Sequence, residues 1–272
     1  MNLPVKLNNG QHIDQLGLGV YKVNQDIAVQ LVGTALDLGY RRIDTAALYD
    51  NEQEVGAAIR KSGIDREEIY VTTKVWNNRQ GYHEAKEAVE ESLERLNIGY
   101  VDMMLIHWPA PKENKFVETW KAFEELLEDG KVRGIGVANF NIHHLEQLLE
   151  STNVVPALNQ VELNPIFQQP ELRAFNAKHG IATEAWAPLG RARILDNPIL
   201  TELAEAHAKS PAQIVIRWHL QIGNLVIPKS SNPDRLAENL NVFDFALSDS
   251  DMAVIATMDT GVRSSNNPDD FD

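Results

Sequence analysis

Short apolar stretches alternate with longer stretches of helical periodicity along most of this chain. The stretches with the length and composition of strands are residues 16–20, 41–44, 69–74, 101–106, 132–137, 157–161, 181–185 and 225–227. Helices are predicted between them over residues 26–38, 52–61, 83–96, 116–128, 142–150, 170–178 and 198–208. Strands that alternate with helices form a parallel sheet covered on both faces. The chain is therefore expected to adopt an α/β fold.

Eight such units can close into a barrel. The chain has 272 residues, and a (β/α)8 TIM barrel typically needs about 250. An open doubly wound sheet would instead carry Gly-x-Gly-x-x-Gly between a strand and a helix, and both Gly17-Leu18-Gly19 and Gly134-Ile135-Gly136 lack the third glycine. No linker or repeat interrupts the series. We interpret residues 1–272 as a single (β/α)8 barrel domain.

Three segments fall outside the alternation. Residues 3–13 alternate around the turn sequence Asn8-Asn9-Gly10, which predicts an N-terminal β-hairpin. Ser210 followed by Pro211 has the form of a helix start and predicts an additional helix to about residue 221. Ser248 similarly opens a second additional helix to about residue 258, and the polar tail beyond it is expected to be loop.

Composition excludes several classes of function. The net charge of −14 disfavours general binding to nucleic acid or to an anionic membrane. The absence of cysteine excludes disulfides, thiolate nucleophiles and cysteine-ligated metal sites. No apolar run approaches the roughly 20 residues of a membrane span, and the N-terminus has no signal-peptide core. We expect a cytoplasmic protein.

Polar side chains stand where successive predicted strands end. Asp44 ends the second strand, with Tyr49 just beyond it, Lys74 ends the third, and His107 follows the fourth. Later strand ends carry Asn139, Gln160 and Lys229. Each residue alone is typical of a solvated or structural position. In a barrel, however, all these strand ends meet at the mouth that holds the active site.

The first four residues make chemical sense as one set. Tyrosine is a weak acid with a pKa near 10, and a neighbouring lysine cation lowers that pKa. An aspartate paired with the lysine would keep it in place and charged. Histidine can orient a carbonyl oxygen and share its developing negative charge. Because the set has no nucleophile of its own, hydride addition to a carbonyl from a bound cofactor fits best.

Several blocks in this order resemble the signature blocks of the aldo-keto reductases, most closely the bacterial 2,5-diketo-D-gluconate reductase group. They are residues 39–49 (GYRRIDTAALY), 73–76 (TKVW), 102–109 (DMMLIHWP), 155–162 (VPALNQVE) and 227–230 (IPKS). The resemblance implies a (β/α)8 barrel that binds NADPH without a Rossmann domain. It implies Tyr49 as general acid, Lys74 and Asp44 tuning it, and His107 orienting the substrate carbonyl.

The resemblance also implies a set of cofactor residues. The nicotinamide carboxamide would be held by Asn139 and Gln160, with Ala138 departing from the usual serine, and Trp186 would stack on the ring. The residues expected along the rest of NADPH are Pro188, Leu189 and Gly190 over the pyrophosphate, then Lys229, Ser230, Ser231, Arg235, Glu238 and Asn239 around the adenosine. Asn232 stands where close relatives can carry another arginine, which implies a milder preference for NADPH over NADH.

Substrate contacts are expected from Tyr21, Trp76, His107 and Trp108. Because the loop after His107 and the tail after Asp259 are short, we expect an open and poorly selective pocket. Small polar aldehydes and ketones, dicarbonyls and keto-sugars such as 2,5-diketo-D-gluconate all fit. The family default is a monomer.

Two other classes of function were weighed. A nucleotide-binding barrel that is regulatory or structural would be expected to lack part of the catalytic set, which is complete here. A metal-dependent hydrolase would need ligand clusters, and His143-His144 and His83-Glu84 are interpreted as solvated residues at helix starts. No metal site is therefore expected.

Overall fold

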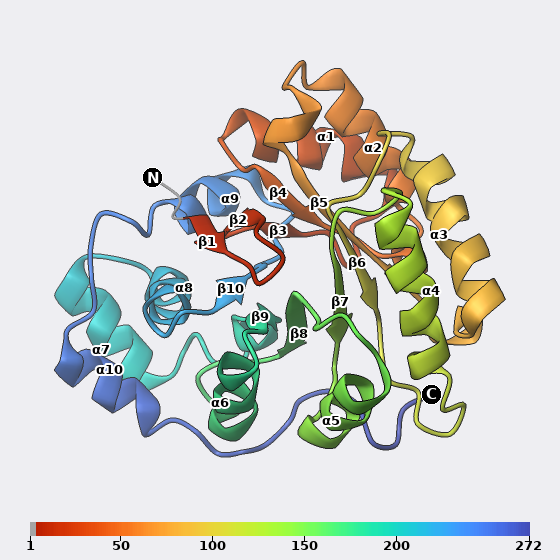
Figure 1. Cartoon of the computed structure of the whole chain (residues 1–272). Helices are drawn as coiled ribbons and strands as arrows, with labels where there is room; N and C mark the ends of the chain where they lie inside the picture. Colours follow the sequence, from red (N-terminus) through yellow and green to blue (C-terminus); the bar gives the residue numbers. More distant parts are fainter. Residues whose placement is uncertain (1–3) are drawn as a thin grey trace.

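Parallel strands form a closed ring at the centre of the molecule (Figure 1). The computed structural model describes residues 4–272. The ring consists of β3 (Leu18–Gly19), β4 (Arg42–Asp44), β5 (Tyr70–Val75), β6 (Met103–Ile106), β7 (Ile135–Ala138), β8 (Leu158–Glu162), β9 (Ala182–Trp186) and β10 (Leu225–Val226). Each strand pairs with its neighbours in sequence. Leu16 bridges Val226 in parallel, so the last strand returns to the first. The predicted barrel is confirmed.

Helices surround this ring (Figure 1). They are α1 (Gln25–Asp37), α2 (Glu52–Lys61), α3 (Tyr82–Leu96), α4 (Phe116–Glu128), α5 (Ile142–Ser151), α6 (Pro170–Lys178), α7 (Pro198–His207), α8 (Pro211–Gln221), α9 (Pro233–Leu240) and α10 (Asp249–Ala256). Short 3-10 turns are η1 (Ala47–Tyr49), η2 (Arg66–Glu68), η3 (Asn77–Arg79) and η4 (Gly190–Ala192). Within residues 4–272, no helix combines the length and apolarity needed to cross a bilayer.

One helix was missed by the sequence prediction, namely α9. Its start carries a clear signal, because the Asn232 side chain accepts a hydrogen bond from the Asp234 backbone N–H at 2.8 Å and Pro233 occupies the first turn. The same asparagine or serine followed by proline begins α7 and α8. Asn232 therefore has a structural role at the position where an arginine could have stood.

The N-terminal hairpin lies across one end of the barrel (Figure 1). Its strands β1 (Pro4–Lys6) and β2 (His12–Asp14) pair antiparallel, as predicted; Leu3 lies outside the described residues. Leu7 and Ile13 pack with apolar side chains of the barrel interior, among them Leu158 and Leu225. The hairpin thus closes the amino end of the barrel and leaves the carboxyl end for chemistry.

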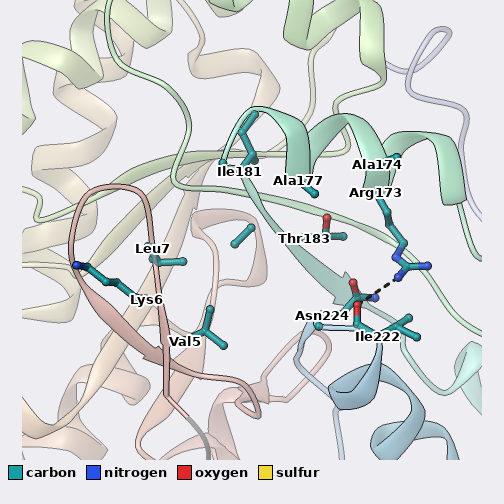
Figure 2. Close-up of a pocket in the computed structure, with 13 residues that line it drawn as sticks. Val5, Lys6, Leu7, Arg173, Ala174, Ala177, Ile181, Thr183, Ile222 and Asn224 are labelled. Atoms are coloured by element: carbon teal, nitrogen blue, oxygen red, sulfur yellow. Dashed lines mark hydrogen bonds between the residues drawn. The ribbon is translucent and has the colours of Figure 1, made fainter.

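A cavity of about 430 Å³ lies between this hairpin, α6 and the turn before β10. Figure 2 shows that the two cations in its lining do not converge: Lys6 points away from Arg173. Arg173 instead donates to the backbone oxygen of Ile222 at 3.2 Å. We therefore assign this cavity to the structural end of the barrel.

Side chains alternate between the two faces of the strands. Ile43 and Val71 face outward and pack in the core under the helices. Asp44, from the same strand as Ile43, contacts Lys74 on β5 and Gln160 on β8. Because β4 and β8 are not neighbours in the ring, the contact between Asp44 and Gln160 runs through the barrel interior. Alternation thus brings polar residues together inside the barrel.

Candidate active site

A lysine, an aspartate and a tyrosine meet at the carboxyl end of the barrel. Asp44 is the last residue of β4, Tyr49 ends the 3-10 turn η1, and Lys74 lies near the end of β5. Lys74 Nζ donates to Asp44 Oδ1 at 2.6 Å and to the backbone oxygen of Thr45 at 2.8 Å. It also lies 3.5 Å from the Tyr49 hydroxyl. These are the contacts that the strand ends predicted.

Burial controls the protonation of these groups. Burial raises the pKa of Tyr49 well above its usual range, and the Asp44 carboxylate adds to that effect. Burial lowers the pKa of Lys74, whereas the attraction of Asp44 raises it. We expected Lys74 to lower the pKa of Tyr49, but burial and the Asp44 carboxylate, which is ion-paired with Lys74 at 2.6 Å, raise it instead. Tyr49 is therefore protonated at neutral pH.

His107 completes the predicted set. Its ring lies against Tyr49, with ring centroids 5.7 Å apart, and against Trp76 at 4.9 Å. Burial, followed by the charge of Lys74, holds the pKa of His107 well below its usual range. The imidazole is therefore neutral and carries one N–H donor. A neutral donor beside a protonated tyrosine can hydrogen-bond a carbonyl oxygen while the tyrosine protonates it.

Aromatic side chains form a wall beside these groups. Tyr21 packs on Tyr49 with ring centroids 5.0 Å apart. Phe271 packs against Trp108 at 4.6 Å and Trp76 at 6.1 Å. The expected aromatic residues do gather at the mouth. Phe271, a lone aromatic in a polar tail, was missed.

The tail that carries Phe271 crosses the mouth instead of leaving it open. The buried carboxylate of Glu162, at the end of β8, accepts from the Ser264 backbone N–H at 2.8 Å and from the Ser265 hydroxyl. Farther along, Asp272 accepts from Lys112 Nζ at 2.8 Å. These contacts, from two separate loops, place the short tail beside the aromatic residues of the mouth, which the expectation of an open pocket did not include.

The residues expected around the nicotinamide also converge. Trp186 Nε1 donates to Asn139 Oδ1 at 2.8 Å, and Asn139 Nδ2 donates to the backbone oxygen of His107 at 2.9 Å. Each Asn139 group keeps capacity for one more hydrogen bond. The Gln160 nitrogen donates to Asp44 at 2.7 Å. Ala138, in place of serine, is buried in the barrel interior and offers only a methyl group.

The expected adenosine end lies on the loop after β10 and on α9. Lys229 and Arg235 are exposed, and Lys229 Nζ donates to Ser231 Oγ at 3.0 Å. Cations beside the first turn of a helix suit a phosphate group. Buried Asn239 and half-buried Glu238 follow on the same helix, and Ser230 is buried in the loop. This donor set fits the phosphate-bearing end of a dinucleotide.

Contacts with the protein core fix the conformation of the loop expected over the pyrophosphate. The buried ring of His219 contacts the backbone oxygen of Pro188 at 3.4 Å. Gly190 has a φ of +55°, and a Cβ on it would lie 2.9 Å from Ile194. Leu189 packs on the main core. Glycine is therefore needed where this loop turns.

The pair His143-His144 departs in part from expectation. His143 is exposed as predicted, but His144 is buried, and its Nδ1 accepts from the Asn141 backbone N–H at 3.2 Å. Asp269 from the tail lies 3.3 Å from His143 Nε2 and 3.7 Å from His144 Nε2. These three residues could in principle face a metal ion. The hydrogen bond to Nδ1 leaves the proton on His144 Nε2, which opposes coordination through that atom.

Comparison with known proteins places this geometry in a family. The profile described as the Aldo/keto reductase family matches residues 14–260. The chain belongs to the aldo/keto reductase family. This membership confirms the expected barrel and the expected enzyme class, an NADPH-dependent oxidoreductase.

Three similar proteins illustrate how fully this aldo/keto reductase matches known chains. An aldo-keto reductase from Mycolicibacterium smegmatis is 51% identical over 271 residues, covering 100% of this chain and 98% of that protein. The glyoxal reductase of Bacillus subtilis is 49% identical over 268 residues, covering 98% of this chain and 96% of that protein. The solved structure of a Gox0644 mutant in complex with NADPH is 46% identical with a TM-score of 0.96, covering 100% of this chain and 99% of that chain.

Proposed function

We propose that this aldo/keto reductase reduces small dicarbonyl compounds to hydroxycarbonyl products with NADPH, using Tyr49 as the general acid. The observation that carries the proposal is the buried contact of Lys74 Nζ with Asp44 Oδ1 at 2.6 Å and with the Tyr49 hydroxyl at 3.5 Å. A protonated tyrosine beside a lysine and a neutral histidine can protonate a carbonyl oxygen as hydride adds to the carbon.

Residues of the chain bind and protonate the carbonyl oxygen of the substrate. NADPH, when bound, supplies the hydride that adds to the carbonyl carbon. His107 donates a hydrogen bond to the oxygen, and Tyr49 transfers its hydroxyl proton to that oxygen as negative charge develops. The Lys74 cation then stabilises the phenolate that Tyr49 becomes, and Asp44 holds Lys74 in place. Asn139, Gln160 and Trp186 would hold the nicotinamide.

The pocket wall supports a small substrate. Tyr21, Trp76, Trp108 and Phe271 line one side of Tyr49 and His107, which should limit the access of water to the reacting atoms. We expect the tail, which sets Phe271 against Trp76 and Trp108, to hinder a long substrate. The similarity to the glyoxal reductase of Bacillus subtilis supports a vicinal dicarbonyl. A keto-sugar such as 2,5-diketo-D-gluconate is the second candidate, because it also presents a carbonyl flanked by polar groups.

A carbonyl panel tests this proposal. NADPH oxidation is followed at 340 nm with glyoxal, methylglyoxal, 2,5-diketo-D-gluconate and simple aldehydes, and we expect the highest kcat/KM with a dicarbonyl. The Tyr49→Phe variant keeps the ring and removes the proton, so kcat should fall about 10²- to 10⁴-fold. NADPH binding, measured by quenching of tryptophan fluorescence, should be unchanged in that variant.

Two outcomes would contradict the proposal. A Tyr49→Phe variant that retains most of the wild-type kcat would remove Tyr49 as the acid. Binding of NADPH without turnover of any panel member would instead support a nucleotide-binding barrel that acts as a regulatory or structural protein.

A further inference from the structure

A chain of charged and polar side chains runs through the barrel interior beneath the candidate active site. Arg42 on β4 forms an ion pair with Glu184 on β9, and both side chains are fully buried. Gln160 on β8 donates to Glu184 Oε2 at 2.7 Å and to Asp44 Oδ2 at 2.7 Å. Asp44 in turn binds Lys74. The chain therefore connects the Arg42–Glu184 pair to the residues proposed to act on substrate.

Such an interior is unusual for this fold. TIM-barrel interiors are normally filled with layers of branched apolar side chains, and burying charges is costly even when they are paired. Burial lowers the pKa of Arg42 only to about 10, so its guanidinium stays charged at neutral pH. The sequence also makes room for Arg42, because a Cβ on Gly17 would lie 2.9 Å from Arg42 Cγ. A buried ion pair is costly, and one that lies next to a functional site is a candidate for a role in that site.

The contacts of Gln160 show what the pair can do. Ionised carboxylates only accept hydrogen bonds, so the amide group 2.7 Å from both Asp44 and Glu184 must be the nitrogen. Both of its hydrogens are then committed. The amide oxygen is left as the acceptor of this side chain, and rotating the amide by 180° would set that oxygen against two carboxylates. Glu184 and Asp44 together therefore fix which end of Gln160 remains available.

We propose that Glu184, held by Arg42, is a positioning residue that fixes the amide of Gln160 so that its oxygen accepts the N–H of the nicotinamide carboxamide. The role rests on the proposed function, in which Gln160 faces the nicotinamide. Glu184 does not touch the cofactor and acts through Gln160. Arg42 keeps the Glu184 carboxylate oriented through the ion pair, and its own position is set by a 2.8 Å hydrogen bond to the backbone oxygen of Asp14.

The experiment compares two cofactors that differ in the group that would donate to Gln160, an amide NH2 in one and a methyl group in the other. Reduced 3-acetylpyridine adenine dinucleotide phosphate carries a methyl ketone in place of the carboxamide, so it keeps the carbonyl and cannot donate to Gln160. Dissociation constants of both cofactors are measured by fluorescence quenching. We expect the wild-type enzyme to bind the analogue roughly five- to tenfold more weakly than NADPH, the value of one hydrogen bond.

Two variants remove the positioning contact. Glu184→Gln replaces one of the two carboxylates with a group that Gln160 can meet in either orientation, so Asp44 alone orients the amide and the ratio of the two dissociation constants should fall from the wild-type value toward one. Because this change leaves Arg42 unpaired, the double variant Arg42→Leu/Glu184→Leu removes both charges together. Replacing a buried ion pair by apolar groups is often neutral for stability, so the double variant should unfold near the wild-type temperature and still have a ratio below the wild-type value.

Each result decides the question. A double variant that folds and keeps the wild-type ratio overturns the proposal, because the pair would then serve packing alone. Single variants whose two dissociation constants rise equally overturn it as well. The Tyr49→Phe variant should keep the wild-type ratio, since binding does not need the acid. A normal Tyr49→Phe ratio combined with unimpaired turnover would therefore reject the proposed function and leave the role of Glu184 intact.

Discussion

Tyr49 and Lys74 have different roles in the proposed proton transfer, and both roles depend on the burial of these residues. The pKa of Tyr49 is raised by burial, so the resting enzyme keeps the proton on the hydroxyl. Proton transfer then creates a phenolate in a dry site, which is costly unless a cation is close. Lys74 Nζ lies 3.5 Å away and is oriented by Asp44 and the Thr45 carbonyl. Lys74 therefore stabilises the phenolate that proton transfer creates, more than it affects the resting, protonated Tyr49.

At the residue scale, Lys74→Met should abolish reduction nearly as completely as Tyr49→Phe, because the phenolate then has no counter-charge. We expect kcat to fall about 10²-fold or more, with NADPH still bound. Steady-state kinetics and fluorescence quenching measure the two quantities separately. Retention of most of the wild-type kcat by Lys74→Met would show that this account of the cation is wrong.

The C-terminal tail is the element that shapes the pocket. It begins after α10 with Thr260, whose N–H donates to the backbone oxygen of Ile166 at 3.0 Å. Glu162, Asn141 and Lys112 then hold it at three successive barrel loops. Phe271 reaches the wall only because all of these contacts direct the chain across the mouth. Selectivity for small carbonyls is therefore expected to depend on the tail.

At the element scale, Phe271→Ala should open the wall and raise KM for a small dicarbonyl about tenfold, with a smaller effect on kcat. Val262→Ala is the matched control, since Val262 lies in the same tail and is 63% exposed. Kinetics with glyoxal and with a longer aldehyde measure both effects. The tail does not select substrates if the two variants behave alike.

The elements differ in how far sequence could predict them. Periodicity located the eight strands, and the rule that barrel chemistry lies at strand ends placed Asp44, Lys74 and His107 together from the sequence alone. Helix α9 was missed although Asn232 and Pro233 signal its start. Phe271 and Glu184 could not have been found, because their contacts depend on long-range packing. In the sequence, Glu184 is one polar residue within a predicted strand. It contacts Arg42 only because the folded barrel brings β9 and β4 to a common interior.

The two ends of the barrel have different roles: the amino end contributes to stability, and the carboxyl end holds the candidate active site. The hairpin and the apolar cluster around Leu7 and Ile13 close the amino end. The tail and the expected cofactor residues occupy the carboxyl end, on loops after β7, β9 and β10. A cofactor bound along that end would contact many of the barrel units at once. Binding should therefore stabilise the fold as a unit.

At the molecular scale, saturating NADPH should raise the unfolding temperature by about 5–10 °C, the shift expected at 100 times the dissociation constant for a chain of this size. Arg235→Leu should reduce the shift with NADPH and leave the shift with NADH unchanged, because Arg235 is proposed to meet the 2′-phosphate. Differential scanning fluorimetry with both cofactors tests this. Equal losses for the two cofactors would contradict a phosphate-specific role.

The anchoring of Asp272 has a practical consequence for handling the protein. The last residue is bonded to Lys112 and follows directly on Phe271, which packs on two tryptophans of the pocket wall. A purification tag or immobilisation linker joined after Asp272 would add its bulk beside the substrate opening. The hairpin that begins at Pro4 lies at the opposite end of the barrel. Biosensor or biocatalyst preparations of this enzyme should therefore be coupled through the amino-terminal end.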